Sequence, residues 1–242
     1  MNNWKIAYQI NKWELKKSIF NIMLSYLVML VFSLYLAREF PLYLESGLVF
    51  FDLVFLFMFG AAPLLPKPKA FEVQQIQSKL FVSPMVVLQK HLAIKNNVII
   101  RSRLIMHTLY TFPMQLVALL ILYSTTSLHN ILSIGSFISF GLIWLSFSIY
   151  VGYMVPSLNI GVRMFWGNNT IFSVIFLLLI IILLFGLTLV HVVFDHGIVY
   201  WSILFARDYP LATGGISILL AFLGYHFWRN SMRKSLGRLM YG

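Results

Sequence analysis

The chain has 242 residues, of which 60% are hydrophobic and only 10% are charged, and its net charge is +11. A soluble domain is about 45–50% apolar and about a quarter charged, so this composition, with a mean hydropathy of +0.85, argues against a soluble protein. No cysteine occurs, which excludes disulfides, thiolate metal sites and cysteine nucleophiles.

Six apolar runs are each close to the length of a transmembrane helix, which needs about 20 residues. In chain order they are Ser18–Ala37, Gly47–Leu65, Leu104–Tyr123, Ile131–Met154, Thr170–Val190 and Leu211–Trp228. Pro113 lies inside the third run and is interpreted as a kink. The sequence therefore predicts an all-α membrane protein with six transmembrane helices, in a single domain over residues 1–242.

Lysines and arginines are distributed unevenly between the two sides of these runs. All but two of the 18, Arg38 and Arg207, fall on the side that holds both ends of the chain. Short cytoplasmic loops carry the excess of basic residues, so both termini are predicted to be cytoplasmic. Because the basic residues flank apolar runs, we expect them to meet anionic lipid headgroups, and we expect no nucleic-acid partner.

Residues 1–17 precede the first apolar run and are rich in lysine. Ile6, Ile10 and Trp13 fall at helical spacing with lysines between them. Such a segment is predicted to be an interfacial helix on the inner membrane surface. A solvated basic flank is the alternative interpretation.

Asp52 lies about five residues inside the outer end of the second run, where a buried carboxylate is costly and often functional. It is a candidate for lining a translocation pathway, binding a cationic substrate or relaying protons. The alternative is that it reaches the water of the outer headgroups. Phe51, Phe55 and Phe59 lie in the same run and are candidates for an aromatic pathway wall, with lipid contact as the alternative.

The long basic segment 66–103 separates the second and third runs. Val73, Ile76 and Leu80 share one face of a helix, so a first amphipathic helix is predicted over Glu72–Phe81.

A second helix is predicted to follow it, because Ser83 can cap a helix and Pro84 suits the first helical position. These two cytoplasmic helices either only anchor the loop or dock a soluble protein.

The outer segment 191–210 begins with a group of polar residues. His191 and Asp195 are four positions apart, and with His196 they can hold a metal ion if the helix continues. Ordinary polar residues at the exit of a span are the alternative. The aromatic part that follows, within "FDHGIVYWSILFARDYP", is apolar enough to enter the outer interface.

This arrangement resembles the membrane subunits of bacterial ABC-2 type exporters: six spans, cytoplasmic termini, and a cytoplasmic helix followed by a Ser-Pro turn after the second span. The resemblance implies that "QQIQSKLFVSPMVVLQKHL" contains the coupling helix, which seats in a cytoplasmic ATPase subunit. The residues that it assigns to this contact are Glu72, Gln75, Ile76, Lys79, Leu80 and Phe81. It also implies the bacterial cell membrane as the location, and a second copy or a sister subunit as partner.

No stretch matches the phosphate-binding pattern G-x-x-x-x-G-K-[ST], so ATP and Mg²⁺ are expected on the partner ATPase, and no catalytic residue or metal site is assigned to this chain. The chain resembles members of the family that export amphipathic peptides such as phenol-soluble modulins, or that protect against bacteriocins. Lipids, lipid-linked glycans and hydrophobic drugs are alternative cargoes. Two other functions remain open: a proton-coupled secondary transporter using Asp52, and a membrane enzyme using the outer cluster of His191, Asp195 and His196.

Overall fold

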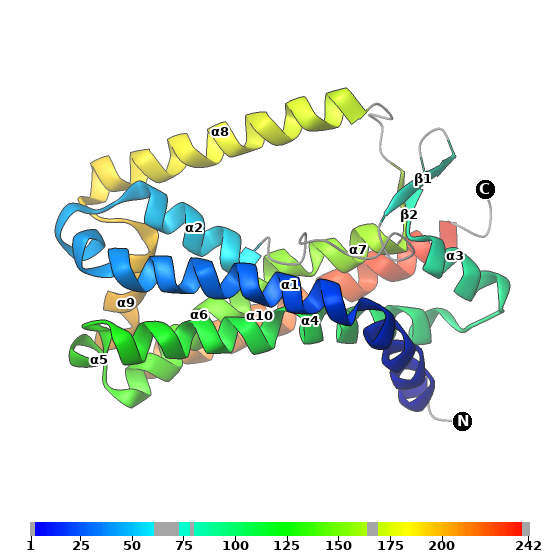
Figure 1. Cartoon of the computed structure of the whole chain (residues 1–242), viewed down its shortest axis with the longest axis horizontal. Helices are drawn as coiled ribbons and strands as arrows, with labels where there is room; N and C mark the ends of the chain where they lie inside the picture. The colour runs from blue at the N-terminus through cyan, green and yellow to red at the C-terminus, as the bar shows by residue number, and fades with distance from the viewer. Residues whose placement is uncertain (1–2, 61–72, 78–79, 164–168, 239–242) are drawn as a thin grey trace.

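The computed structural model describes residues 3–60, 73–77, 80–163 and 169–238, and this part of the chain is predominantly helical (Figure 1). Among the described residues, five helices are long and apolar enough to cross a membrane. They are α1 (Asn3–Ser46), α4 (Asn96–Thr125), α6 (Ile134–Gly152) with its continuation α7 (Met154–Ile160), α8 (Asn169–Phe194) and α10 (Pro210–Arg238). The shorter helices are α2 (Val49–Gly60), α3 (Pro84–His91), α5 (Leu128–Ile131) and α9 (Ile198–Asp208).

The predicted all-α membrane architecture is confirmed at this level, because five of the six predicted runs lie in long helices. The second run differs. Its described helix, α2, has 12 residues and a length of about 18 Å, less than the roughly 30 Å of a bilayer core. Residues 61–65 of that run lie outside the described part of the chain, so a sixth span stays a prediction.

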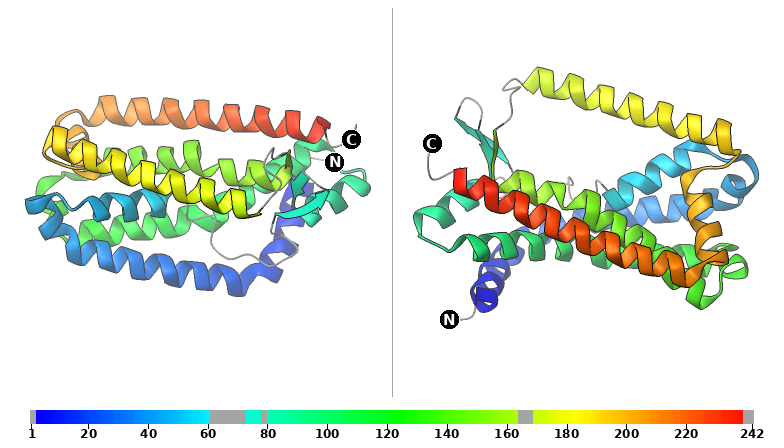
Figure 2. Two further views of the ribbon diagram at one scale, coloured as in Figure 1. Left: turned by 90° about the horizontal axis from the view of Figure 1, so that it is seen from above. Right: turned by 180° about the vertical axis from the view of Figure 1, so that it is seen from behind.

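The two ends of the helix bundle differ in what they carry. Figure 1 places the start of α1, the end of α10, α3 and the strands at one end, and α5, α9 and the α1–α2 turn at the other. Figure 2 shows the same arrangement from above and from behind. The end with both chain termini is the one for which the sequence predicts the cytoplasm, and we call it the inner end.

The N-terminal segment is helical from Asn3 and continues into the first span, so it is not a separate helix; its predicted position on the inner membrane surface stays a prediction. A single helix of 44 residues runs from Asn3 to Ser46, although Figure 1 shows its first part turning away from the rest. Trp13 is exposed, as a side chain that faces lipid or headgroups would be. The residues of α1 that are buried recur at spacings of mostly three and four, and they are Ala7, Asn11, Glu14, Ser18, Ser25, Met29, Ser33, Leu36, Phe40 and Tyr43.

Polar and small side chains join α1 to α4 near the inner end. Ser102 Oγ donates a hydrogen bond to Asn11 Oδ1 at 2.6 Å, and Arg103 forms a two-pronged ion pair with Glu14. Helices in membranes gain little from apolar burial against one another, because lipid is equally apolar. Small residues and interhelical hydrogen bonds therefore carry much of their association.

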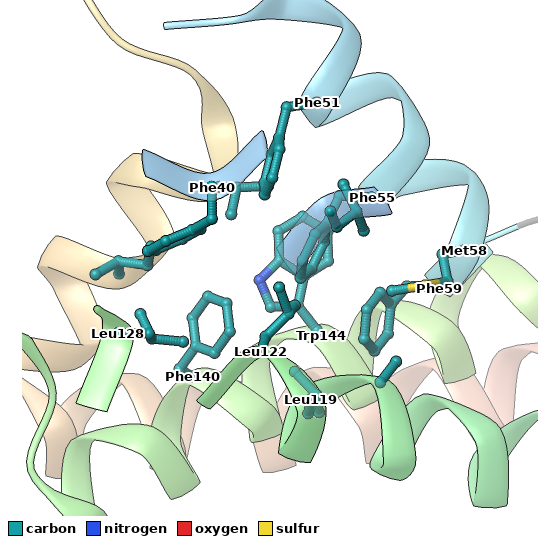
Figure 3. Packing of buried hydrophobic residues seen from close by; sticks show 14 of the residues in the cluster. Phe40, Phe51, Phe55, Met58, Phe59, Leu119, Leu122, Leu128, Phe140 and Trp144 are labelled. Carbon is teal, nitrogen blue, oxygen red and sulfur yellow. The ribbon is translucent and has the colours of Figure 1, made fainter. Parts of the chain in front are cut away.

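The outer half of the bundle is held by an apolar cluster, in which α1, α2 and α6 contribute buried aromatic rings and α4 contributes aliphatic side chains (Figure 3). The ring of Trp144 lies 4.5 Å from Phe55 and 5.6 Å from Phe59 between centroids. Trp144 Nε1 also donates to Ser202 Oγ at 3.1 Å, which ties α6 to α9. This cluster fixes α2 inside the bundle and α9 over its outer end.

The helix predicted over Glu72–Phe81 is wrong. The described residues there form strands β1 (Gln74–Gln77) and β2 (Leu80–Val82), which pair as an antiparallel hairpin. Strand β3 (Val162–Arg163), from beyond α7, pairs with the other edge of β2. The sequence "LFV" suits a strand, and a partner about 80 positions away completes a sheet that helical spacing alone does not reveal.

The predicted start of the second helix of this segment is confirmed, although the helix ends at His91. Helix α3 starts at Pro84 with Ser83 as its N-cap, as the Ser-Pro pair indicates. The backbone N–H of Ser83 donates to the carbonyl of Asn159 at 3.0 Å. The start of α3 is therefore attached to α7.

Candidate functional site

A buried carboxylate lies at the outer end, where α1, α2, α8 and α9 meet. Gly47, with a φ of +64°, turns the chain from α1 into α2, and this left-handed conformation favours glycine. Asp52 then falls in the first turn of α2, where a negative charge is favourable to the helix dipole. Its side chain has no exposed surface.

Three donors from three different elements satisfy this carboxylate. Oδ1 of Asp52 accepts from the hydroxyl of Tyr43 at 2.9 Å and from the backbone N–H of Val199 at 2.8 Å. Oδ2 lies 2.7 Å from Nε2 of His191, whose N–H is the donor because a carboxylate oxygen only accepts. The hydroxyl of Tyr43 in turn accepts from the N–H of Tyr200 at 2.9 Å. We call Tyr43, Asp52 and His191, with these two backbone groups, the Asp52 centre.

The close approach of the chain at this point requires Gly197. A Cβ on this residue would lie 1.7 Å from Oδ2 of Asp52 and 2.6 Å from Nε2 of His191. Gly197 is also the N-cap of α9, so the carboxylate receives an N–H from the first turn of that helix. The Asp52 centre thus binds the start of α9 and the end of α8 to α1 and α2.

The outer cluster predicted from His191, Asp195 and His196 is not assembled. His191 binds Asp52, while the ring of His196 stacks on Tyr200 with centroids 3.9 Å apart. Asp195 has a φ of +60° just beyond the end of α8, so the helix does not continue and the spacing of four does not place it beside His191. Within the described residues, no group of three metal-ligating side chains is present.

The four predicted pathway residues lie inside the core. Phe51, Asp52, Phe55 and Phe59 are each at most 1% exposed. In this structure they fill the space between α2 and its neighbours, and their role in lining a pathway stays a prediction. On the same helix, Phe50 and Phe57 are the exposed aromatics.

The predicted coupling residues lie at the inner end, on the small sheet. Gln75 and Ile76 are in β1, and Leu80 and Phe81 are in β2. Glu72 and Lys79 lie outside the described residues.

Helix α3 extends this inner surface. Leu88 of α3 and Leu92 at its C-cap are exposed, whereas Val86 and Gln89 are buried. Lys90 donates to the side chain of Asn96, which connects the end of α3 to the start of α4, and partial burial lowers the pKa of this lysine. The β1–β2–β3 sheet is therefore connected to α3, and α3 to α4, by contacts between neighbouring segments of the chain.

Sequence reasoning missed the residues that connect the elements. Tyr43 completes the Asp52 centre, and Gln115 donates through Nε2 to the carbonyls of Met58 and Phe59, both at 3.3 Å, at the end of α2. A polar residue within an apolar run was a usable signal for Gln115, since such groups need partners inside a membrane protein. Tyr43 lies between the first two predicted runs and carried no such signal.

Comparison with known protein families, with curated proteins and with solved structures finds no match for this chain.

Proposed function

We propose that this protein is the membrane subunit of an ATP-driven exporter of the ABC-2 type, working with a separate cytoplasmic ATPase. The observation that carries the proposal is the folded element at the inner end. Two segments far apart in the sequence, 73–95 and 154–163, meet there through the pairing of β2 with β3. A loop that only links two spans needs no such structure, whereas a surface that receives force from a soluble subunit does.

The contacts of this element lead directly into the bundle. On one side α3 continues through Lys90 and Asn96 into α4. On the other side the N–H of Ser83 binds α7 through Asn159. A push on α3 and the hairpin would move α4 and α7 together, as a rigid-body change between two states. The chain transmits force, and the partner hydrolyses ATP.

The cargo that we propose is an amphipathic or hydrophobic molecule, most simply a peptide. This proposal for the cargo is supported by the resemblance to peptide exporters and by the apolar exterior of the chain. The pathway would then form between this chain and a second copy or a sister subunit.

Purification of the complex from its native membrane tests the proposal. We expect an ATPase subunit to copurify and to turn over nucleotide. Replacing both exposed leucines of the inner surface, Leu88→Glu with Leu92→Glu, should weaken that association, whereas Ser124→Glu at the outer end should not. Transport of cargo by the isolated chain in liposomes without any ATPase would refute the proposal.

A proton-coupled secondary transporter is a second candidate, favoured by one observation. Asp52 and His191 form a buried pair, 2.7 Å apart, between a carboxylate and an imidazole, and buried ionisable groups within spans are the kind of residue that proton relays use. Such a transporter needs no nucleotide-binding partner, and Asp52→Asn would abolish its proton-driven uptake or efflux in liposomes. ATP-dependent transport that survives Asp52→Asn would exclude it.

A further inference from the structure

Helix α8 is the least packed of the five long helices. Over Val174–Phe194, the part whose side chains are described apart from residue 176, only Leu187 is buried. Figure 1 shows α8 close to α2 at its C-terminal end and diverging from the bundle toward its N-terminal end. The view from behind in Figure 2 shows the same divergence.

One polar contact lies at the C-terminal end of α8. His191, in the last turn of α8 and with only 9% of its side chain exposed, binds the buried carboxylate of Asp52. Among the described residues, the bond between His191 and Asp52 is the polar side-chain contact that joins Val174–Phe194 to the rest of the bundle. Beyond it, α8 ends at Phe194, and Asp195 with its positive φ and Gly197 lead into α9.

The apolar contacts of α8 and the hydrogen bond of His191 respond differently when α8 moves away from the bundle. Apolar side chains of α8 lose little by leaving the bundle, because lipid replaces the protein atoms they touched. The hydrogen bond of His191 has no such replacement, since an unpaired carboxylate away from water is costly. The position of α8 is therefore controlled by the Asp52 centre far more than by its apolar surface.

We infer that α8 is a movable arm, hinged at residues 195–197, and that the bond between His191 and Asp52 is the clasp that holds it against the bundle. Breaking this bond releases the arm while α9 stays in place, because α9 is held separately by Trp144 through Ser202. This conformational device does not depend on the identity of the motor or of the cargo.

Distance measurements between spin labels test the inference directly, because the chain contains no native cysteine. The reporting pair is Ile182→Cys on α8 and Leu120→Cys on α4, both at exposed positions. In lipid nanodiscs we expect one narrow distance distribution in the parent chain. Adding His191→Leu should shift and broaden it toward longer distances, and His191→Gln, which keeps an N–H donor, should restore the parent distribution.

Two controls separate release of the arm from unfolding. The pair Leu120→Cys and Ile138→Cys, on α4 and α6, should report the same distance in every variant. Val192→Ala, next to His191 but 75% exposed, should leave the α8 distance unchanged. An α8 distance that His191→Leu does not change would overturn the inference, and so would a change of both pairs together, since that indicates a merely structural bond.

Discussion

Glu14 and Arg103 lie 89 positions apart in the sequence and form a two-pronged ion pair between α1 and α4. Their side chains are only 5% and 2% exposed. Arg103 Nη2 also reaches Ser102 Oγ at 3.4 Å, and Ser102 binds Asn11. The N-terminal part of α1 is thus fixed to α4 by a buried ion pair.

Removing one partner of this pair should destabilise the protein strongly. Arg103→Ala leaves a buried carboxylate without its counter-ion, and the expected loss is about 3–5 kcal/mol in the free energy of unfolding. The measurement is unfolding in mixed micelles of detergent and SDS. Arg101→Ala is the matched control, because Arg101 lies over the ring of Trp4 and loses only about 0.5–1 kcal/mol of cation–π attraction.

The double substitution Glu14→Leu with Arg103→Leu should be far milder than either single one, since no buried charge is left unpaired. If the single and double variants lose the same free energy of unfolding, the pair is in contact with water, contrary to what its burial indicates.

Gln115 should stabilise the C-terminal end of α2. Gln115 Nε2 donates to the carbonyls of Met58 and Phe59, in the last described turn of α2. Gln115→Leu should cost roughly 1–3 kcal/mol in the same unfolding measurement, because two carbonyls then lose a donor. Leu116→Ala, at an exposed neighbour, should cost less. A Gln115→Leu variant as stable as the parent would contradict this role.

The long helices were predictable because each is a continuous apolar run, and run length is a local property of the sequence. The connections between them were not. Asp52 was identified as unusual, yet its partners Tyr43 and His191 come from other helices, and only the fold brings them together. The periodicity of the buried face of α1, from Ala7 to Tyr43, was present in the sequence but was hidden by exposed apolar residues on the lipid-facing side.

The segment Glu72–Phe81 shows why short elements are ambiguous. Val73, Ile76 and Leu80 fit one face of a helix, but a stretch this short fits a hairpin as well when another strand is available. That strand, Val162–Arg163, is set by tertiary structure. By contrast, the Ser83–Pro84 signal acts locally, through the fixed φ of proline, and its prediction was confirmed.

Gln89 of α3 should be replaceable with a gain in stability. It is 1% exposed, and neither polar atom of its side-chain amide has a hydrogen-bond partner among the described residues. An unpaired buried amide costs about 1–3 kcal/mol, so Gln89→Leu should raise the free energy of unfolding by about that amount. Leu88→Ala, on the exposed side of the same helix, should have a small effect. Lower stability of Gln89→Leu would show that the amide has a partner.

The orientation in the membrane can be checked with single cysteines, because the parent chain has none. His91 and Lys95 are exposed at the inner end, whereas Ser124 and Asp208 are exposed at the other. The predicted order of spans assigns all but two of the 18 lysines and arginines to the side that holds both termini, and such an excess of basic residues is typical of the cytoplasmic side. A membrane-impermeant maleimide should therefore label Ser124→Cys and Asp208→Cys in intact cells, and His91→Cys and Lys95→Cys only after permeabilisation. The reverse pattern would place the sheet and α3 outside the cell, where no ATPase can reach them.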